Sequence, residues 1–149
     1  MSTRIYYRHV ARSRAPFELD RFFAALSDRT RLRLLNLMDG QEVCVCYFVE
    51  ILGQSQPKIS RHLAYLRRAG IVSARREGKW MHYGLMPPPH AGAAQILGQT
   101  LAALKQEKEM QSDRARLARA CCSPRATHLA GAPLPLPSVE DACEACSTA

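Results

Sequence analysis

Residues 54–70 read QSQPKISRHLAYLRRAG, and their spacing predicts an amphipathic helix that ends at Gly70. Ile59, Leu63 and Leu66 lie at i, i+4 and i+7, so at about 100° per residue they share one face, which we expect to be buried. Pro57 is compatible with the first turn of such a helix, because a backbone N–H would have no partner there. The opposite face is expected to be cationic and exposed. It carries Lys58, Arg61, Tyr65 and Arg68.

A second, shorter helix is expected just before this one, from about residue 44 to residue 52, ended by Gly53. Two helices joined by a tight turn that contains glycine are typical of a helix-turn-helix, whose second helix enters the major groove of DNA. Amide and guanidinium groups suit base edges in that groove, whereas hydroxyl and ammonium groups suit phosphates. The expected DNA-contacting residues are Gln56 and Arg61 for bases, Lys58 and Ser60 for phosphates, and His62 at the edge of the same surface.

A β-hairpin is expected directly after the predicted recognition helix. Residues 71–74 and an alternating apolar run through Met81, Tyr83 and Leu85 flank a turn at Glu77 and Gly78. A basic hairpin in this position is a wing, placed to reach a neighbouring groove or the DNA backbone. The wing cations expected to contact DNA are Arg75, Arg76 and Lys79.

The chain on either side of this region is also expected to be helical. One helix begins near Phe17, and Ser27 with Asp28 forms an N-cap signal for a second helix that stops at residues 39–40. After three prolines, a single long helix is expected over about 88–119. It carries an apolar stripe at near-heptad spacing, made of Ala94, Leu97, Leu101 and Leu104. A domain this small has little core left to cover the stripe, so we expect a homodimer interface that suits paired half-sites on DNA.

The composition supports a nucleic-acid partner. The 149 residues contain 21 Lys and Arg against 13 Asp and Glu, which gives a net charge of +8 with histidine neutral. Residues 55–83 hold seven cations against one anion, so the charge is concentrated in the predicted recognition helix and wing. No run approaches the roughly 18 apolar residues of a membrane span, and no apolar core follows the N-terminal arginines. We therefore expect a cytoplasmic protein without a membrane partner.

The expected fold is mainly α with a small β-hairpin: a winged helix-turn-helix that dimerises through its terminal helices. Residues 1–16 are expected to form a flexible basic arm, with a targeting peptide as the alternative. Residues 17–120 are expected to form the winged domain, including the dimerisation helix. Residues 121–149 are rich in proline and small side chains and are expected to be a disordered tail that contains cysteines.

Cys44 and Cys46 are the candidate site of chemistry, because a chain without an export signal is expected to keep its thiols reduced. In a regular helix, positions i and i+2 point about 200° apart, so both thiolates reach one ion only if the first turn unwinds or never forms. Soft thiolates select soft ions, and ligation would pull on the helix that supports the recognition helix. The remaining cysteines, Cys121, Cys122, Cys143 and Cys146, either bind metal or belong to a dispensable tail. A quartet of ligands suited to zinc is not found outside the tail.

Four blocks of the sequence together resemble the ArsR/SmtB family of winged-helix repressors, and specifically its arsenic-responsive branch. The blocks are LSDRTRL at 26–32, EVCVC at 42–46, QSQPKISRHL at 54–63 and GKWMHY at 78–83. The resemblance covers roughly residues 17–115, and four blocks in the right order are far more specific than any one of them. It implies a homodimer that represses an arsenic-resistance operon and leaves double-stranded operator DNA when trivalent arsenic or antimony binds the Cys44 and Cys46 thiolates. No resident cofactor is implied.

The resemblance also shows where this chain departs from the family pattern. Tyr47 stands where an acidic residue commonly follows the second cysteine, and Val49 stands where well-known members have a third thiol. Trivalent arsenic prefers three sulfurs in its family sites, so Cys121 or Cys122, from either subunit, is the candidate third ligand; solvent or a small thiol is the alternative. The histidine and carboxylate pattern of zinc-sensing relatives and the N-terminal cysteines of cadmium-sensing relatives are missing, which favours arsenic.

Three other functions remain open on the sequence alone. The same thiols suit a redox-sensing or sulfide-sensing repressor that binds no metalloid. A thiol enzyme would need a shaped pocket and an acid–base partner, neither of which the pattern offers, so we expect no catalysis. The third alternative is an architectural DNA binder without an effector, in which replacing both Cys44 and Cys46 would leave DNA release unaltered.

Overall fold

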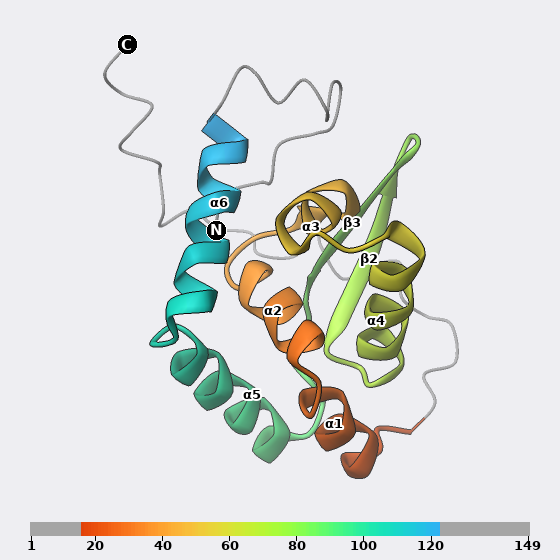
Figure 1. Ribbon diagram of the computed structural model, residues 1–149. Helices are drawn as coiled ribbons and strands as arrows, with labels where there is room; N and C mark the ends of the chain where they lie inside the picture. Colours follow the sequence, from red (N-terminus) through yellow and green to blue (C-terminus); the bar gives the residue numbers. More distant parts are fainter. Residues whose placement is uncertain (1–15, 123–149) are drawn as a thin grey trace, which may run out of the picture.

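The computed structural model describes residues 16–122, which form helices around a small antiparallel sheet (Figure 1). The elements in chain order are α1 (Leu19–Leu26), α2 (Arg29–Leu37), β1 (Val43–Cys44), α3 (Val45–Leu52), α4 (Gln56–Arg68), β2 (Val72–Glu77), β3 (Trp80–Leu85), α5 (Ala91–Leu104) and α6 (Lys108–Cys122). The fold is a winged helix-turn-helix, as the sequence predicted. The predicted arm and the tail beyond residue 122 lie outside the described residues.

Local signals set the ends of the central helices. The Asp28 carboxylate accepts a hydrogen bond from the backbone N–H of Arg31 at 2.9 Å and so caps the first turn of α2. Gly53 ends α3 with φ of 63°, a left-handed conformation that favours glycine, and Ser55 precedes α4 with Pro57 in its first turn. The predicted helix-turn-helix therefore consists of α3 and α4.

The sheet contains one strand more than the sequence predicted. Its strand order is β1-β3-β2, with both pairs antiparallel, and β2 with β3 forms the wing around Gly78. β1 is only two residues long, which is too short for an alternating pattern of apolar and polar residues to predict it. Its register places Cys44 opposite His82, and His82 is in turn opposite Arg75 on β2. The candidate thiol site is thus joined by backbone pairing to the wing.

One core, built from α1 to α6 and the sheet, carries the recognition helix. Ile59, Leu63 and Leu66 are fully buried on the inner face of α4, as their spacing predicted. They meet a cluster that includes Phe22, Leu34, Leu35, Tyr47, Phe48 and Ile51. Because α4 packs against α2, α3 and β2, its outer face is held at a fixed angle.

The single long helix predicted over 88–119 is instead two helices. α5 ends at Leu104, and after Lys105 to Glu107 the chain turns so that α6 packs along α2 and α3 (Figure 1). The apolar stripe on α5 is also only partly free for a partner, because Leu97 and Leu104 are buried in their own chain and α5 packs against α2. Leu97 and Leu104 are therefore covered by their own chain, whereas Ala94 and Leu101 are half-buried, and the homodimer interface on this helix stays a prediction. Among residues 16–122, no helix is both long and apolar enough to cross a membrane.

Candidate DNA interface and thiol pair

The outer face of α4 offers the exposed polar surface that the sequence predicted. Gln56, Lys58 and Arg61 are exposed, and Ser60 is half-buried. The opposite face of the helix is buried, so these side chains point away from the core on a rigid support. Cations and an amide on one such face suit phosphates and base edges.

His62 is placed differently from its predicted neighbours on the DNA-contacting surface. Its side chain is only 18% exposed, and its Nδ1 lies 3.5 Å from Oδ1 of Asp28, the residue that caps α2. Burial lowers the pKa of His62, and the nearby Arg31, Lys58 and Arg61 lower it further, whereas Asp28 acts in the opposite direction. His62 therefore lies at the junction of α2 and α4.

The three wing cations fall into two groups. Arg76 and Lys79 are exposed; Arg76 donates to the carbonyl of Gly78 at 3.0 Å, and Lys79 lies 5.1 Å from the centre of the Trp80 ring. Arg75 instead pairs with two carboxylates, Glu42 at 2.9 Å and Glu77 at 2.8 Å. Hydrogen bonds to Glu77 and Glu42 raise the pKa of Arg75, and those to Arg75 lower the pKa of Glu77. Only Arg76 and Lys79 present unneutralised charge among the predicted wing contacts.

The two thiols lie close together at the junction of β1 and α3. Cys44 is buried at the end of β1 with an extended backbone, and Cys46 is the second residue of α3 and half-buried. The Cys46 Sγ donates to the Cys44 Sγ across 3.1 Å. The helix never forms at Cys44, so the expected opposition of positions i and i+2 does not arise here. The pair is arranged to approach a single ion without unwinding α3.

The surroundings of Cys46 favour its protonated form. Burial and the hydrogen bond to Cys44 raise the pKa of Cys46 to about 12. An ion that binds here must therefore displace thiol protons, as soft metal ions do. Among the side chains that the structure describes, those of residues 16–120, no group of three His, Cys, Asp or Glu is arranged to hold a metal ion, so none of them is a third ligand for the pair. The side chains of Cys121 and Cys122 lie outside the described residues.

A cross-strand row next to the pair was not predicted. His82, opposite Cys44, is 3% exposed, and its Nε2 has no hydrogen-bond partner and lies 3.6 Å from a Glu77 oxygen. Together with the Glu42 to Arg75 ion pair, this row ties the strand of Cys44 to the wing. Glu42 and Arg75 are 33 positions apart and Cys44 belongs to an unpredicted strand, so local patterns gave no signal that the thiol pair and the wing are joined.

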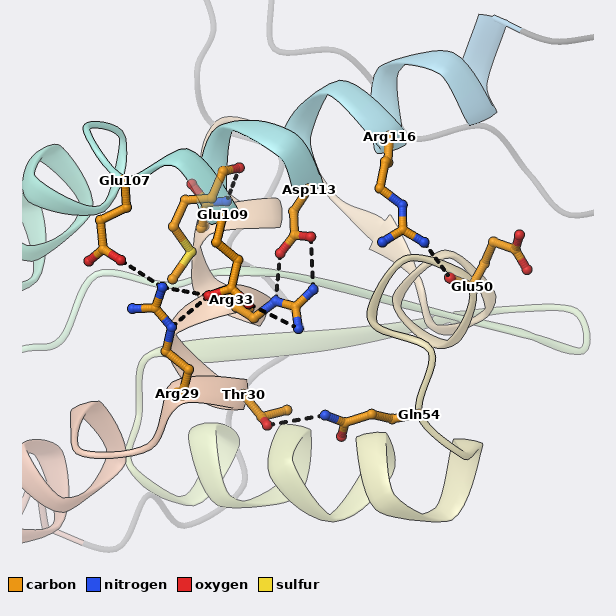
Figure 2. Close-up of polar contacts among 11 residues, drawn as sticks. Arg29, Thr30, Arg33, Glu50, Gln54, Glu107, Glu109, Asp113 and Arg116 are labelled. Atoms are coloured by element: carbon orange, nitrogen blue, oxygen red, sulfur yellow. Dashed lines mark hydrogen bonds and ion pairs between the residues drawn. The ribbon is translucent and has the colours of Figure 1, made fainter.

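Sequence reasoning also missed the polar clamp that fastens α6 to α2. Figure 2 shows Arg33 of α2 facing Asp113 of α6, with Nε to Oδ2 at 2.7 Å and Nη2 to Oδ1 at 2.8 Å. Arg29 pairs with Glu107 and Glu109 at the edge of the clamp, and Arg116 donates to the carbonyl of Glu50 on α3 at 3.4 Å. α6 therefore holds together α2 and α3, the helix that contains Cys46.

The exposed large apolar side chains of residues 16–122 gather on α1 and α5. They are Leu19 at 44% exposed, Phe23 at 48% and Ile96 at 37%. Ile96 borders a hollow along α5 that is otherwise lined by small or uncharged polar side chains. Figure 1 shows α1 and α5 next to each other, at the opposite end of the molecule from the wing tip. This surface differs from the stripe that the sequence suggested for dimerisation.

A recognition helix with an exposed basic face, followed by a basic wing, defines a winged helix-turn-helix DNA-binding regulator. Comparison with known proteins identifies the family within this class. Residues 28–74 match the model of the bacterial regulatory protein, arsR family. The chain is 43% identical over 102 residues to the arsenical resistance operon repressor of Escherichia coli K12, an alignment that spans 68% of this chain and 86% of that protein. The chain belongs to the ArsR family and is a DNA-binding transcriptional repressor.

Other relatives have similar names. The arsenic resistance transcriptional regulator ArsR1 of Pseudomonas putida KT2440 is 52% identical over 66 residues, which cover 44% of this chain and 52% of that protein. Among solved structures, the AntR antimony-specific transcriptional repressor aligns at 25% identity with a TM-score of 0.48, over 71% of this chain and 96% of that one. The names of the Escherichia coli and Pseudomonas putida relatives describe regulators of transcription.

Proposed function

We propose that the protein represses an arsenical-resistance operon as a homodimer and leaves its operator when trivalent arsenic or antimony binds the thiolates of Cys44 and Cys46. The observation that carries this proposal is the 3.1 Å separation of the two sulfur atoms at the junction of β1 and α3. Paired thiolates are soft ligands suited to soft ions. The names of the Escherichia coli and Pseudomonas putida relatives support arsenic as the effector.

The position of the pair provides two routes from ligand to DNA. α3 packs directly against α4, so a shift at Cys46 is transmitted to the recognition helix. Cys44 lies on β1, which pairs with β3 of the wing. When two bonds to one ion replace the hydrogen bond between the thiols, the positions of β1 and α3 change together. An effector that binds only the altered arrangement lowers the affinity for DNA by the same factor by which DNA lowers the affinity for the effector.

The third ligand is proposed to be Cys121 or Cys122, from either subunit, with solvent or a small thiol as the alternative. The support comes from the path of α6, which packs against α3 and whose backbone continues to Cys122. Leu117 and Ala120 of α6 contact the same core as Cys46. Cys121, the next residue of α6, therefore continues a helix that already packs against α3, which contains Cys46.

The DNA contacts are proposed to come from Gln56 and Arg61 on bases and from Lys58, Ser60, Arg76 and Lys79 on phosphates. His62 and Arg75, which the sequence placed with them, are proposed to orient α4 and the wing instead, since each has a partner within the chain. Dimerisation is proposed through α1 and α5, where Leu19, Phe23 and Ile96 leave apolar surface exposed. A two-fold dimer would present two recognition helices to a partly palindromic operator.

One titration tests the effector and the ligands together. The purified protein on its own promoter fragment is titrated with arsenite, antimonite, cadmium and zinc, and DNA release is followed by fluorescence anisotropy. Arsenite and antimonite should release the wild type, and Cys44→Ser should abolish the response while it leaves DNA affinity without effector intact. Cys121→Ser with Cys122→Ser should weaken the response. If the response to arsenite were lost only in the Cys121→Ser, Cys122→Ser variant, the assignment of Cys44 and Cys46 would be wrong.

The short distance between the thiols also favours one rival function. Two sulfurs 3.1 Å apart could be oxidised to a disulfide by a peroxide, which would make the protein a redox-sensing repressor. The raised pKa of Cys46 opposes this, because the thiolate is the form that reacts. Release by hydrogen peroxide but not by arsenite would select the redox function.

A further inference from the structure

A basic hollow lies between α1 and the C-terminal half of the recognition helix. It is lined by Arg21 of α1 and by Tyr65 and Arg68 of α4, with a volume of about 300 Å³. Tyr65 and Arg68 lie on the same outer face of α4 as Lys58 and Arg61, because the four residues recur at helical spacing. The hollow therefore continues the candidate DNA-contacting face toward the end of the helix.

A third arginine, Arg31, holds the Tyr65 ring that lines the hollow. The Arg31 guanidinium lies 4.4 Å from the centre of the Tyr65 ring and donates to the carbonyls of Ala25 at 2.8 Å and Ala24 at 2.7 Å. These carbonyls belong to the last turn of α1, so Arg31 joins the end of α1 to the ring on α4. The Arg68 guanidinium lies 5.8 Å from the same ring. A cationic site on such a support loses little side-chain freedom when an anion binds.

The hollow carries more positive than negative charge, which favours binding of an anion. Arg21 and Arg68 bring two guanidinium groups to it, and Glu18, at 2.9 Å from Arg21, is the one carboxylate of residues 16–122 in an ion pair with either of them. Arg68 has no ion pair within residues 16–122. Guanidinium groups bind phosphate oxygens through paired hydrogen bonds, and a tyrosine hydroxyl can add another.

The distance along the helix matches the width of the DNA groove. Lys58 and Arg68 are ten residues apart, which corresponds to a rise of about 15 Å along α4. The major groove is about 12 Å wide, with a phosphate backbone on each side. A helix that places Arg61 at base edges therefore brings its two ends close to opposite backbones. The hollow lies at the C-terminal end of α4, where none of the DNA-contacting residues expected from the sequence is found.

We propose that Arg21, Tyr65 and Arg68 form a phosphate site that holds the DNA backbone at the C-terminal end of the recognition helix. The inference rests on α4 acting as the recognition helix in the proposed function. It adds α1 to the DNA interface, which the sequence assigned to α4 and the wing alone. A free anion offers the same chemistry as a phosphodiester, but only a phosphodiester contact changes the salt dependence of DNA binding.

The salt dependence of DNA binding tests the site. The dissociation constant of the full-length protein is measured on its promoter fragment and on a random duplex from 50 to about 300 mM salt. Loss of one phosphate contact reduces the log–log slope by about 0.9. The double variant Arg21→Ala with Arg68→Ala should show this reduction on both duplexes, because a backbone contact carries no sequence information. Glu18→Gln should tighten binding on both, since it removes the carboxylate that competes for Arg21.

Arg67 provides the matched control. It is exposed and adjacent to Arg68 but lies about 100° around the helix and does not line the hollow. Arg67→Ala should keep the wild-type slope, and circular dichroism should show all variants folded. An unchanged slope in the double variant, or an equal loss in Arg67→Ala, would overturn the site. If the wild type itself failed to prefer its promoter fragment over the random duplex, the proposed function rather than this site would fail.

Discussion

Glu42 and Arg75 form an ion pair that joins the loop before the thiol pair to the wing. Glu42 Oε2 lies 2.9 Å from Nη2 and 3.1 Å from Nε of Arg75, and the third guanidinium nitrogen lies 2.8 Å from Glu77. Glu42 precedes Cys44 by two residues, and Arg75 faces His82, which faces Cys44. Arg75, which has two carboxylate partners, is thus the wing arginine that connects the wing to the segment holding the thiol pair.

This pairing predicts unequal roles for the wing cations. Arg76→Ala and Lys79→Ala should each reduce the log–log salt slope of DNA binding by about 0.9, which corresponds to one phosphate contact. Arg75→Ala should leave the slope nearly unchanged, because two carboxylates already neutralise its charge. Anisotropy titrations over a range of salt concentrations measure all three. If Arg75→Ala reduced the slope as much as Arg76→Ala does, Arg75 would be a phosphate contact.

Arg61 is expected to contribute to sequence preference rather than to general affinity. It is exposed in the middle of the outer face of α4, where a guanidinium can make paired hydrogen bonds to a guanine. Arg61→Ala should weaken operator binding by about 1 to 3 kcal/mol and random-duplex binding by much less. Competition binding with the two duplexes measures the difference. An equal loss on both would make Arg61 a phosphate contact.

The parts of the fold that the sequence predicted correctly are those with local causes. Ile59, Leu63 and Leu66 mark the buried face of α4 by their spacing, and Asp28 marks the start of α2 by its capping chemistry. The break between α5 and α6 escaped prediction because Lys105 to Glu107 contain no glycine or proline.

The candidate site was predictable in composition but not in geometry. The sequence identified Cys44 and Cys46 and placed both in one helix, whereas β1 holds Cys44 extended and brings the sulfurs within 3.1 Å. That strand depends on its pairing with β3, some 40 residues later, so it has no local signal. Charge patterning likewise could not separate Arg75 from Arg76, because Glu42 approaches only in the folded chain.

His62 should make stability depend on pH below neutrality. Burial lowers its pKa in the folded protein from the ordinary value of 6.5, with Arg31, Lys58 and Arg61 acting in the same direction and Asp28 against it. Between the folded-state pKa and 6.5, the unfolded chain binds more protons, so the free energy of unfolding falls as pH falls through this range. His62→Gln should lose less stability than the wild type between pH 7 and about 5. Urea denaturation at several pH values measures both; parallel profiles would exclude this role.

The buried ion pair between Arg33 and Asp113 should contribute most to holding α6 in place (Figure 2). The side chains of Asp113 and Arg33 are only 3% and 16% exposed, so Asp113→Ala leaves a largely buried guanidinium with only its 3.5 Å contact to the more exposed Glu109. Breaking such a pair costs about 3 kcal/mol, whereas removing an exposed charge costs less than about 1 kcal/mol. Glu109→Gln is the comparison, since Glu109 contacts the same Arg33 guanidinium at 3.5 Å, as well as Arg29, but is 43% exposed. Replacing both members, with Arg33→Met and Asp113→Leu, should restore much of the loss, because no charge then remains buried alone. Urea denaturation measures the four proteins, and equal losses in Asp113→Ala and Glu109→Gln would show that burial does not strengthen this contact.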